Sequence, residues 1–120
     1  MIDCKSWGEL QTMDRCNRIV LDILERLKEQ AKPGVTTGDL DRMAEEWTYD
    51  AGALPAFKGY RGYPATLCAS INEVIVHGIP SHRELRDGDI IGLDMGVILD
   101  GYYGDSAMTV PVGTISDDAA

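Results

Sequence analysis

The sequence predicts an α+β fold in which two N-terminal helices pack on an antiparallel sheet that contains a hairpin over residues 89–112. Two patterns lead to this prediction. Apolar residues recur at three- and four-residue steps through about the first fifty residues, as they do on one face of a helix. Along 89–112 they alternate instead, with the period of a strand that is buried on one side. The chain has 120 residues and is 44% hydrophobic, which suits one compact domain spanning residues 1–120.

The first predicted helix opens at Ser6, because Glu9 stands three residues later and completes a capping box. It ends at residues 32–34, Lys-Pro-Gly, since proline cannot continue the hydrogen-bond ladder and glycine tolerates the turn. Its predicted apolar face consists of Leu10, Met13, Val20, Leu24, Leu27 and Ala31.

The second predicted helix is capped by Thr36 or Thr37 and stops near Gly52. Its apolar residues are Leu40, Met43, Ala44, Trp47 and Ala51. Residues 55–86 follow, rich in Gly, Pro and Tyr, and there we expect short strands and ordered loops of the kind that carry functional side chains.

Composition excludes several classes of protein. The net charge of −9 disfavours nucleic acid or an anionic membrane as a partner. No run of about 18 apolar residues is present, so we expect no membrane span. The N-terminus lacks the basic and apolar regions of a secretory signal. The cysteines, Cys4, Cys16 and Cys68, are odd in number and suit free thiols, so we expect a reducing, cytoplasmic location.

The hairpin brings two carboxylates together. Asp100-Gly101 between two apolar strands predicts a two-residue type I′ turn, which needs positive φ at both positions. With that turn Asp94 faces Ala107, and Asp94 and Asp105 project from one face as diagonal neighbours, roughly 7–8 Å apart at the backbone. A β-bulge in either strand would change this register. Asp100 itself is assigned to the turn and not to chemistry.

The surroundings of Asp94 favour a ligand. Gly92 and Gly96 flank it on the same face, and glycine weakens a strand unless something must approach the backbone closely. Two neighbouring carboxylates raise each other's pKa unless a cation lies between them, and such hard oxygen ligands suit divalent metals. The spacing alone leaves a metal site and a structural role equally open, with Asp105 in a loop and Asp94 bonded to backbone in the structural case.

Histidine is scarce, and His77 is the more informative of the pair. It follows the apolar run at 74–76 and precedes a Gly-x-Pro turn. An isolated histidine there is either a satisfied structural residue or a group that binds substrate or donates a proton near neutral pH. His82, between Ser81 and Arg83, is expected to be exposed.

Several motifs together resemble the type I methionine aminopeptidases, metallopeptidases with the pita-bread fold. They cover nearly the whole chain from about residue 8. They are Lys32-Pro33-Gly34-Val35-Thr36-Thr37, Gly59-Tyr60-x-Gly62-Tyr63-Pro64, Ile71-Asn72-Glu73-Val74-Ile75-Val76-His77-Gly78-Ile79-Pro80, Asp87-Gly88-Asp89, Asp94-x-Gly96 and Asp100-Gly101-Tyr102-x-Gly104-Asp105. The related Xaa-Pro peptidases share the Asp-x-Gly and Gly-Asp elements but lack the Asn-Glu-Val-x-x-His-Gly-Ile-Pro motif.

The resemblance implies a site and a substrate. Asp94 would chelate one metal ion, Asp105 would bridge two divalent ions of the Co, Mn, Fe, Zn or Ni class, and His77 would contact substrate as a catalytic residue. The substrate would be the N-terminal methionine of nascent proteins. The methionine pocket would be lined by Tyr60, Tyr63, Cys68 and Phe57, although family members often carry a small residue or cysteine where Phe57 stands.

The resemblance also implies that this chain is the N-terminal half of a longer enzyme. Family members are about twice as long, and one histidine and two glutamates of their metal site come from the second half. We therefore expect the truncated chain to bind metal weakly or not at all, to be nearly inactive alone, and to self-associate. The alternatives are a non-catalytic pita-bread binding module and a Xaa-Pro-type metallopeptidase.

Overall fold

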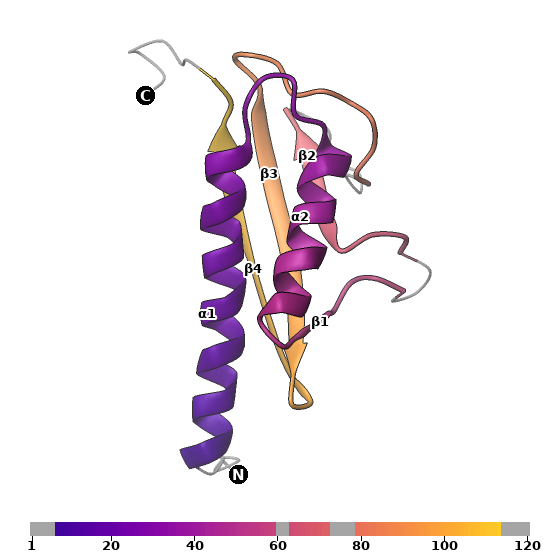
Figure 1. Ribbon diagram of the computed structural model, residues 1–120. Helices are drawn as coiled ribbons and strands as arrows, with labels where there is room; N and C mark the ends of the chain where they lie inside the picture. The colour runs from indigo at the N-terminus through magenta and orange to yellow at the C-terminus, as the bar shows by residue number, and fades with distance from the viewer. Residues whose placement is uncertain (1–6, 60–62, 73–78, 114–120) are drawn as a thin grey trace.

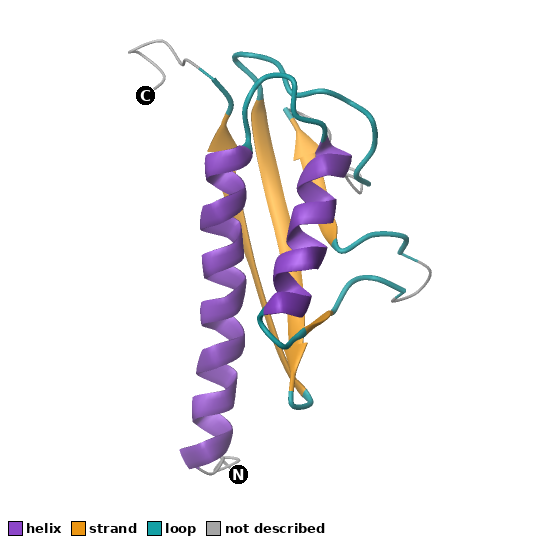
Figure 2. Cartoon of the chain, viewed as in Figure 1, coloured by secondary structure: helices purple, strands orange, loops and turns teal. Residues whose placement is uncertain are grey.

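The computed structural model describes residues 7–59, 63–72 and 79–113, and these form two layers (Figure 1). Helices cover one face of an antiparallel sheet, as Figure 2 shows, and the predicted α+β arrangement is confirmed. The elements are α1 (Trp7–Gln30), α2 (Thr37–Asp50), β1 (Leu54–Pro55), β2 (Leu67–Ile71), β3 (Ile90–Leu99) and β4 (Tyr102–Pro111).

Strand β3 is the centre of the sheet. Along one edge it pairs with β4 over the full length of both strands. Its other edge is shared, because β1 pairs near one end, with Pro55 opposite Val97, while β2 pairs further along, with Leu67 opposite Met95. All of these pairings are antiparallel. One side of every strand therefore faces the helices, and the other side is the open face of the sheet.

Helix α1 buries most of the predicted stripe. Val20, Leu24 and Leu27 are fully buried, and Cys16 joins them. Leu10 differs from the prediction, since it is 46% exposed. Figure 1 shows the reason: the first turns of α1 extend beyond the end of the hairpin, so they have no sheet to cover. No helix in the described part of the chain has an apolar stretch long enough to cross a membrane.

Helix α2 begins with a capping box, which decides between the two predicted caps. The Thr36 side chain accepts a hydrogen bond from the Asp39 amide at 3.0 Å, and the Asp39 carboxylate accepts one from the Thr36 amide at 3.0 Å. Thr36 is therefore the cap, and Thr37 is the first helical residue. The helix ends at Asp50, and Gly52 follows with a φ of +79°, close to the predicted stop.

The core lies between the helices and the inner face of the sheet. In β3 the alternate residues Ile91, Leu93, Met95 and Val97 are all at most 1% exposed, which confirms the predicted inner face. The opposite residues of the same strand point away from the helices. The carboxylate of Asp94 therefore lies on the open face.

Candidate metal centre and side-chain pocket

The turn of the β3–β4 hairpin fixes its register as the sequence predicts. Asp100 and Gly101 have φ values of +51° and +82°, the two positive angles of a type I′ turn. Gly96 lies opposite Asp105, and the pairing continues without a bulge through both strands. Asp94 and Asp105 therefore share the open face of the sheet, as the spacing predicts.

The environment of Asp94 disfavours its charged form. Partial burial raises the pKa of Asp94 above its ordinary value, and the negative charge of Asp105 raises it further. Asp100, by contrast, lies in the turn, where its carboxylate is 3.4 Å from the guanidinium of Arg15. The structure thus brings together the pair that was predicted and leaves the third aspartate outside it.

The chemistry of this pair fits a divalent cation. Carboxylate oxygens are hard ligands, and a cation between Asp94 and Asp105 would offset the repulsion that adds to the effect of burial on the pKa of Asp94. Among residues 7–59, 63–72 and 79–113, no third histidine, cysteine, aspartate or glutamate completes a cluster of metal ligands. This part of the chain therefore offers two carboxylates, on neighbouring strands, that could bind a metal ion.

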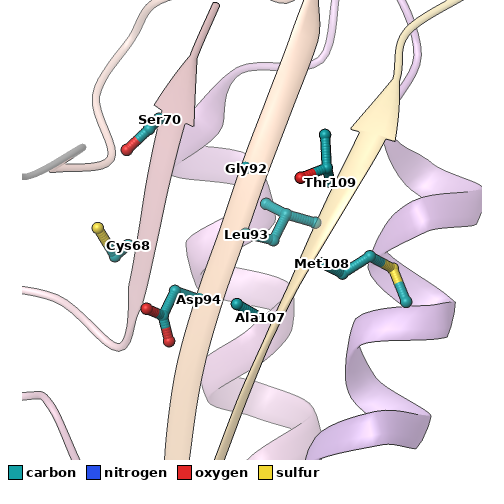
Figure 3. A pocket seen from close by; sticks show the side chains of 8 residues that line it. All are labelled: Cys68, Ser70, Gly92, Leu93, Asp94, Ala107, Met108 and Thr109. Atoms are coloured by element: carbon teal, nitrogen blue, oxygen red, sulfur yellow. The ribbon is translucent and has the colours of Figure 1, made fainter. Parts of the chain in front are cut away.

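A groove runs along the open face beside Asp94 (Figure 3). Its volume is about 450 Å³. The lining residues are Cys68, Ser70, Gly92, Leu93, Asp94, Ala107, Met108 and Thr109. A Cβ added at Gly92 would meet only the Ser70 carbonyl oxygen, at 3.8 Å, so this glycine does leave open space. In Figure 3 the thiol of Cys68 and the carboxylate of Asp94 point to the same side from neighbouring strands.

At Gly96 the space is used by the protein itself. A Cβ there would lie 3.1 Å from the Tyr103 hydroxyl oxygen and 3.2 Å from the Ala56 Cβ. The same hydroxyl is 3.4 Å from the Asp105 carboxylate, to which it donates. The sequence carried a signal for this contact that we did not use: Tyr103 and Asp105 are two residues apart on a strand and so share a face.

Of the predicted pocket residues, Cys68 and Tyr63 lie near Asp94, and Phe57 contacts Tyr63. The rings of Phe57 and Tyr63 meet edge to face with centroids 6.4 Å apart. The Tyr63 hydroxyl donates to the Leu67 carbonyl oxygen at 2.8 Å, and Cys68 is the cross-strand partner of Asp94. The pKa of Tyr63 is raised far above its usual range, first by burial and then by Cys68. Whether these side chains bind substrate stays a prediction.

Two predicted site residues, Tyr60 and His77, lie outside the described residues. His82 and Asp89, which lie further along the chain, are described. His82 is exposed, as expected. Asp89 belongs to a turn, where its carboxylate accepts from the Arg86 amide at 2.9 Å and from the Asn72 side chain at 3.2 Å. The Arg86 amide is the main reason that the pKa of Asp89 is lowered.

Asp41 of α2 is a residue that the sequence analysis did not identify. Its Oδ1 accepts hydrogen bonds from the Thr66 amide at 2.9 Å and the Leu67 amide at 2.8 Å. Burial raises the pKa of this carboxyl, and the hydrogen bonds from the two amides act in the opposite direction. No local pattern announces such a contact, because its partners lie 25 and 26 residues away along the chain.

Comparison with known proteins agrees with this geometry. The sequence model of Metallopeptidase family M24 matches residues 11–120, and the chain belongs to this family. It is 52% identical over 118 residues to methionine aminopeptidase 1 of Bacillus subtilis (strain 168), covering 98% of this chain and 48% of that protein. It is also 52% identical over 121 residues to the methionine aminopeptidase of Clostridium acetobutylicum, covering 100% and 48%. The chain thus spans about half the length of these curated relatives and corresponds to their N-terminal half.

Solved structures show the same relationship. Methionine aminopeptidase from Rickettsia prowazekii superposes with a TM-score of 0.91 at 34% identity, covering 99% of this chain and 48% of that one. The Thermotoga maritima enzyme gives 0.90 at 35% identity, covering 98% and 47%. Prolidase from Pyrococcus furiosus gives 0.79 at 20% identity, covering 95% and 32%, a likeness of fold alone. The expected pita-bread fold is confirmed, and this chain forms half of it.

Proposed function

We propose that this chain supplies one half of a metal-dependent aminopeptidase site that removes the N-terminal methionine of nascent proteins. The observation that carries the proposal is that Asp94 and Asp105 lie on the same face of the sheet. They do so in a chain whose sequence is 52% identical to two methionine aminopeptidases. A pair of like charges on an open sheet face has no structural benefit by itself. The pair of like charges becomes favourable when a cation is bound between them.

Asp94 and Asp105 would hold the metal from this side of the site. When bound, divalent ions of the Co, Mn, Fe, Zn or Ni class supply an acidified water and polarise the peptide carbonyl. The hairpin holds the two carboxylates in a fixed relation to each other, because β3 and β4 are joined by a tight turn and paired along their full length. The hairpin therefore presents both oxygens from one rigid element.

The neighbouring side chains suit a methionine side chain. Phe57 and Tyr63 offer aromatic edges and faces, and Cys68 offers a sulfur atom, all of which pack well against a thioether. Because Cys68 lies directly across from Asp94, a residue in this pocket would have its backbone close to the carboxylate pair. We assign Tyr60 to the same pocket and substrate contact to His77 on the basis of the motifs that contain them.

We propose that the 120-residue chain by itself has little or no activity. The described residues contribute two carboxylates, and the curated relatives are about twice as long. Two carboxylate ligands hold a divalent ion weakly compared with a complete set of ligands.

Metal binding by the carboxylate pair can be tested on the chain itself. Paramagnetic Mn²⁺ broadens the NMR signals of nearby amides even when it binds weakly. We expect selective broadening around Asp94 and Asp105, lost in Asp94→Asn and in Asp105→Asn. Asp100→Asn is the matched control, since Asp100 lies in the turn of the same hairpin, and it should broaden like the unmodified chain. Broadening centred on other acidic residues would contradict the proposed site.

Substrate choice separates the proposal from a Xaa-Pro-type peptidase. A longer polypeptide, in which the second half of a family member follows this chain, should cleave Met-Ala-Ser and leave peptides with proline in second position intact. The reverse preference would favour the Xaa-Pro reading, which so far rests on likeness of fold. Absence of cleavage, with Mn²⁺ binding retained, would favour a non-catalytic binding module.

A further inference from the structure

We propose that Asp41 is a positioning residue for the side-chain pocket: from α2 it fixes the start of β2, and thereby places Tyr63 and Cys68 relative to Asp94. The catalytic consequence of this role rests on the proposed function, whereas the positioning itself does not. Asp41 is not among the residues that line the groove beside Asp94. It acts through the backbone of β2.

The contacts of Asp41 converge on one short segment. A single oxygen, Oδ1, accepts from two consecutive amides, those of Thr66 and Leu67, at 2.9 and 2.8 Å. Leu67 is held a second time, because its carbonyl oxygen accepts from the Tyr63 hydroxyl at 2.8 Å. Asp41 and Tyr63 thus bind the same residue, Asp41 at its N–H and Tyr63 at its C=O.

These two amides need an acceptor. Thr66 and Leu67 are both fully buried, and a buried N–H without a partner costs a large part of its hydration free energy. A carboxylate is a suitable acceptor because charge-assisted hydrogen bonds are stronger than neutral ones. Burial raises the pKa of Asp41, and the two amides limit this rise because they favour the ionised form.

The hydrogen bonds from Asp41 hold a residue, Leu67, that is next to Cys68 in the chain. Leu67 pairs with Met95, and the next pair in the register is Cys68 with Asp94. Side chains alternate between faces, so a slip of one residue at the start of β2 would turn Cys68 toward the helices. Fixing the amides of residues 66 and 67 therefore fixes which side chain of β2 stands beside Asp94.

Helix α2 holds the other end of the same loop as well. Glu45, one turn after Asp41, pairs with Lys58, next to the aromatic pocket residue Phe57. The segment that carries Tyr63 is consequently fastened to α2 on both sides, at Lys58 and at Thr66. The carboxylate pair, Asp94 and Asp105, is held in a different way, by the β3–β4 hairpin. Loss of Asp41 should therefore loosen the pocket and spare the carboxylate pair.

Amide hydrogen exchange of the ¹⁵N-labelled chain tests the positioning role. In Asp41→Ala we expect the Thr66 and Leu67 amides to exchange about tenfold faster, while the amides of the β3–β4 hairpin keep their rates. Asp41→Asn keeps an acceptor oxygen without the charge and should give an intermediate rate. Glu46→Ala, which removes an exposed carboxylate from the same helix, is the control and should match the unmodified chain.

Alkylation of the Cys68 thiol by iodoacetamide gives a second readout, followed by peptide mass spectrometry. Its rate should rise about fivefold in Asp41→Ala and stay unchanged in Glu46→Ala. Equal acceleration of all amides, or identical behaviour of Asp41→Ala and Glu46→Ala, would overturn the proposal, because either result means general destabilisation or no role.

The catalytic consequence is read in the longer polypeptide described above. There Asp41→Ala should raise KM for Met-Ala-Ser about tenfold, and leave kcat and Mn²⁺ affinity within about twofold. A purely structural defect would lower the active fraction, and hence kcat, without changing KM. If the exchange and alkylation results hold and the unmodified polypeptide cleaves no methionyl peptide, the positioning role stands and the proposed function falls.

Discussion

Asp94 and Asp105 show how a single pair of residues can destabilise the folded state. They extend from one face of a sheet, and the charge of Asp105 contributes to raising the pKa of Asp94. A raised pKa means that the folded state disfavours the ionised carboxylate relative to the unfolded chain. Without a cation, the pair therefore lowers the free energy of unfolding at neutral pH.

Asp94→Asn is expected to stabilise the metal-free chain. The substitution removes the repulsion and keeps the shape of the side chain, so the free energy of unfolding should rise, by less than about 1 kcal/mol because solvent screens both groups. Urea denaturation in the presence of a chelator measures it. Asp100→Asn is the control, and it should give no gain, since it removes an exposed ion pair with Arg15. A loss of stability in Asp94→Asn would mean that its carboxylate makes a favourable contact.

Predictability at this scale depends on where a residue's partners lie. The pairing of Asp94 with Asp105 follows from local information, because a two-residue turn and the period of a strand determine it. The role of Asp41 does not, since its partners are set by how α2 packs beside β2. Tyr63 and Cys68 were identified as pocket residues only through the resemblance, as loop aromatics and lone thiols are otherwise ordinary packing.

Helix α1 and strand β4 approach each other closely at Gly104. A Cβ on Gly104 would lie 2.9 Å from the Cβ of Cys16 and 3.0 Å from the side-chain oxygen of Asn17. The Cys16 thiol also donates to the Tyr102 carbonyl oxygen at 3.4 Å, so the helix rests directly on the start of the strand. The glycine is what allows this distance.

Gly104→Ala should destabilise the chain by about 1–3 kcal/mol, because the added methyl group forces α1 away from β4. Chemical denaturation followed by circular dichroism measures the change. Gly92→Ala is the matched control on the neighbouring strand, where the added Cβ meets nothing closer than 3.8 Å. It should change stability by less than about 0.5 kcal/mol. Similar losses in both variants would point to strand propensity and away from helix packing.

The elements themselves were largely predictable, and their ends less so. The periodicity of α1 and α2 and the turn chemistry at Asp100-Gly101 are local signals, and the structure confirms both helices and the turn, although Leu10 and Ala51 of the predicted apolar faces are exposed. The exposure of Leu10 was missed because periodicity does not say where the supporting sheet ends. The burial of Cys16 was missed because it depends on the close approach at Gly104.

At the scale of the whole molecule, β3 is the strand that contacts the other strands and the helices of the described fold. It pairs with β1, β2 and β4, and its inner face packs against the helices. Damage to its core residues should therefore reach all parts of the described fold at once.

Met95→Ala is expected to lower the free energy of unfolding by about 2–5 kcal/mol, because Met95 is fully buried and the substitution leaves a cavity. Trp47 fluorescence, on α2, and hydrogen exchange of hairpin amides should report the same shift, as expected of one cooperative unit. Leu54→Ala is the control, since Leu54 is 57% exposed. Transitions that separate between the two probes would show that α2 unfolds independently of the sheet.

The two-residue turn at Asp100-Gly101 has a consequence for how this sequence can change over evolutionary time. A single residue inserted between the turn and one of the carboxylates would reverse the face of the strand beyond it and move that carboxylate to the helix side, unless a bulge absorbed it. A residue inserted in the turn itself would lengthen the loop and keep the pairing. We therefore expect lineages to change the length of this hairpin at the turn and not between the turn and either carboxylate.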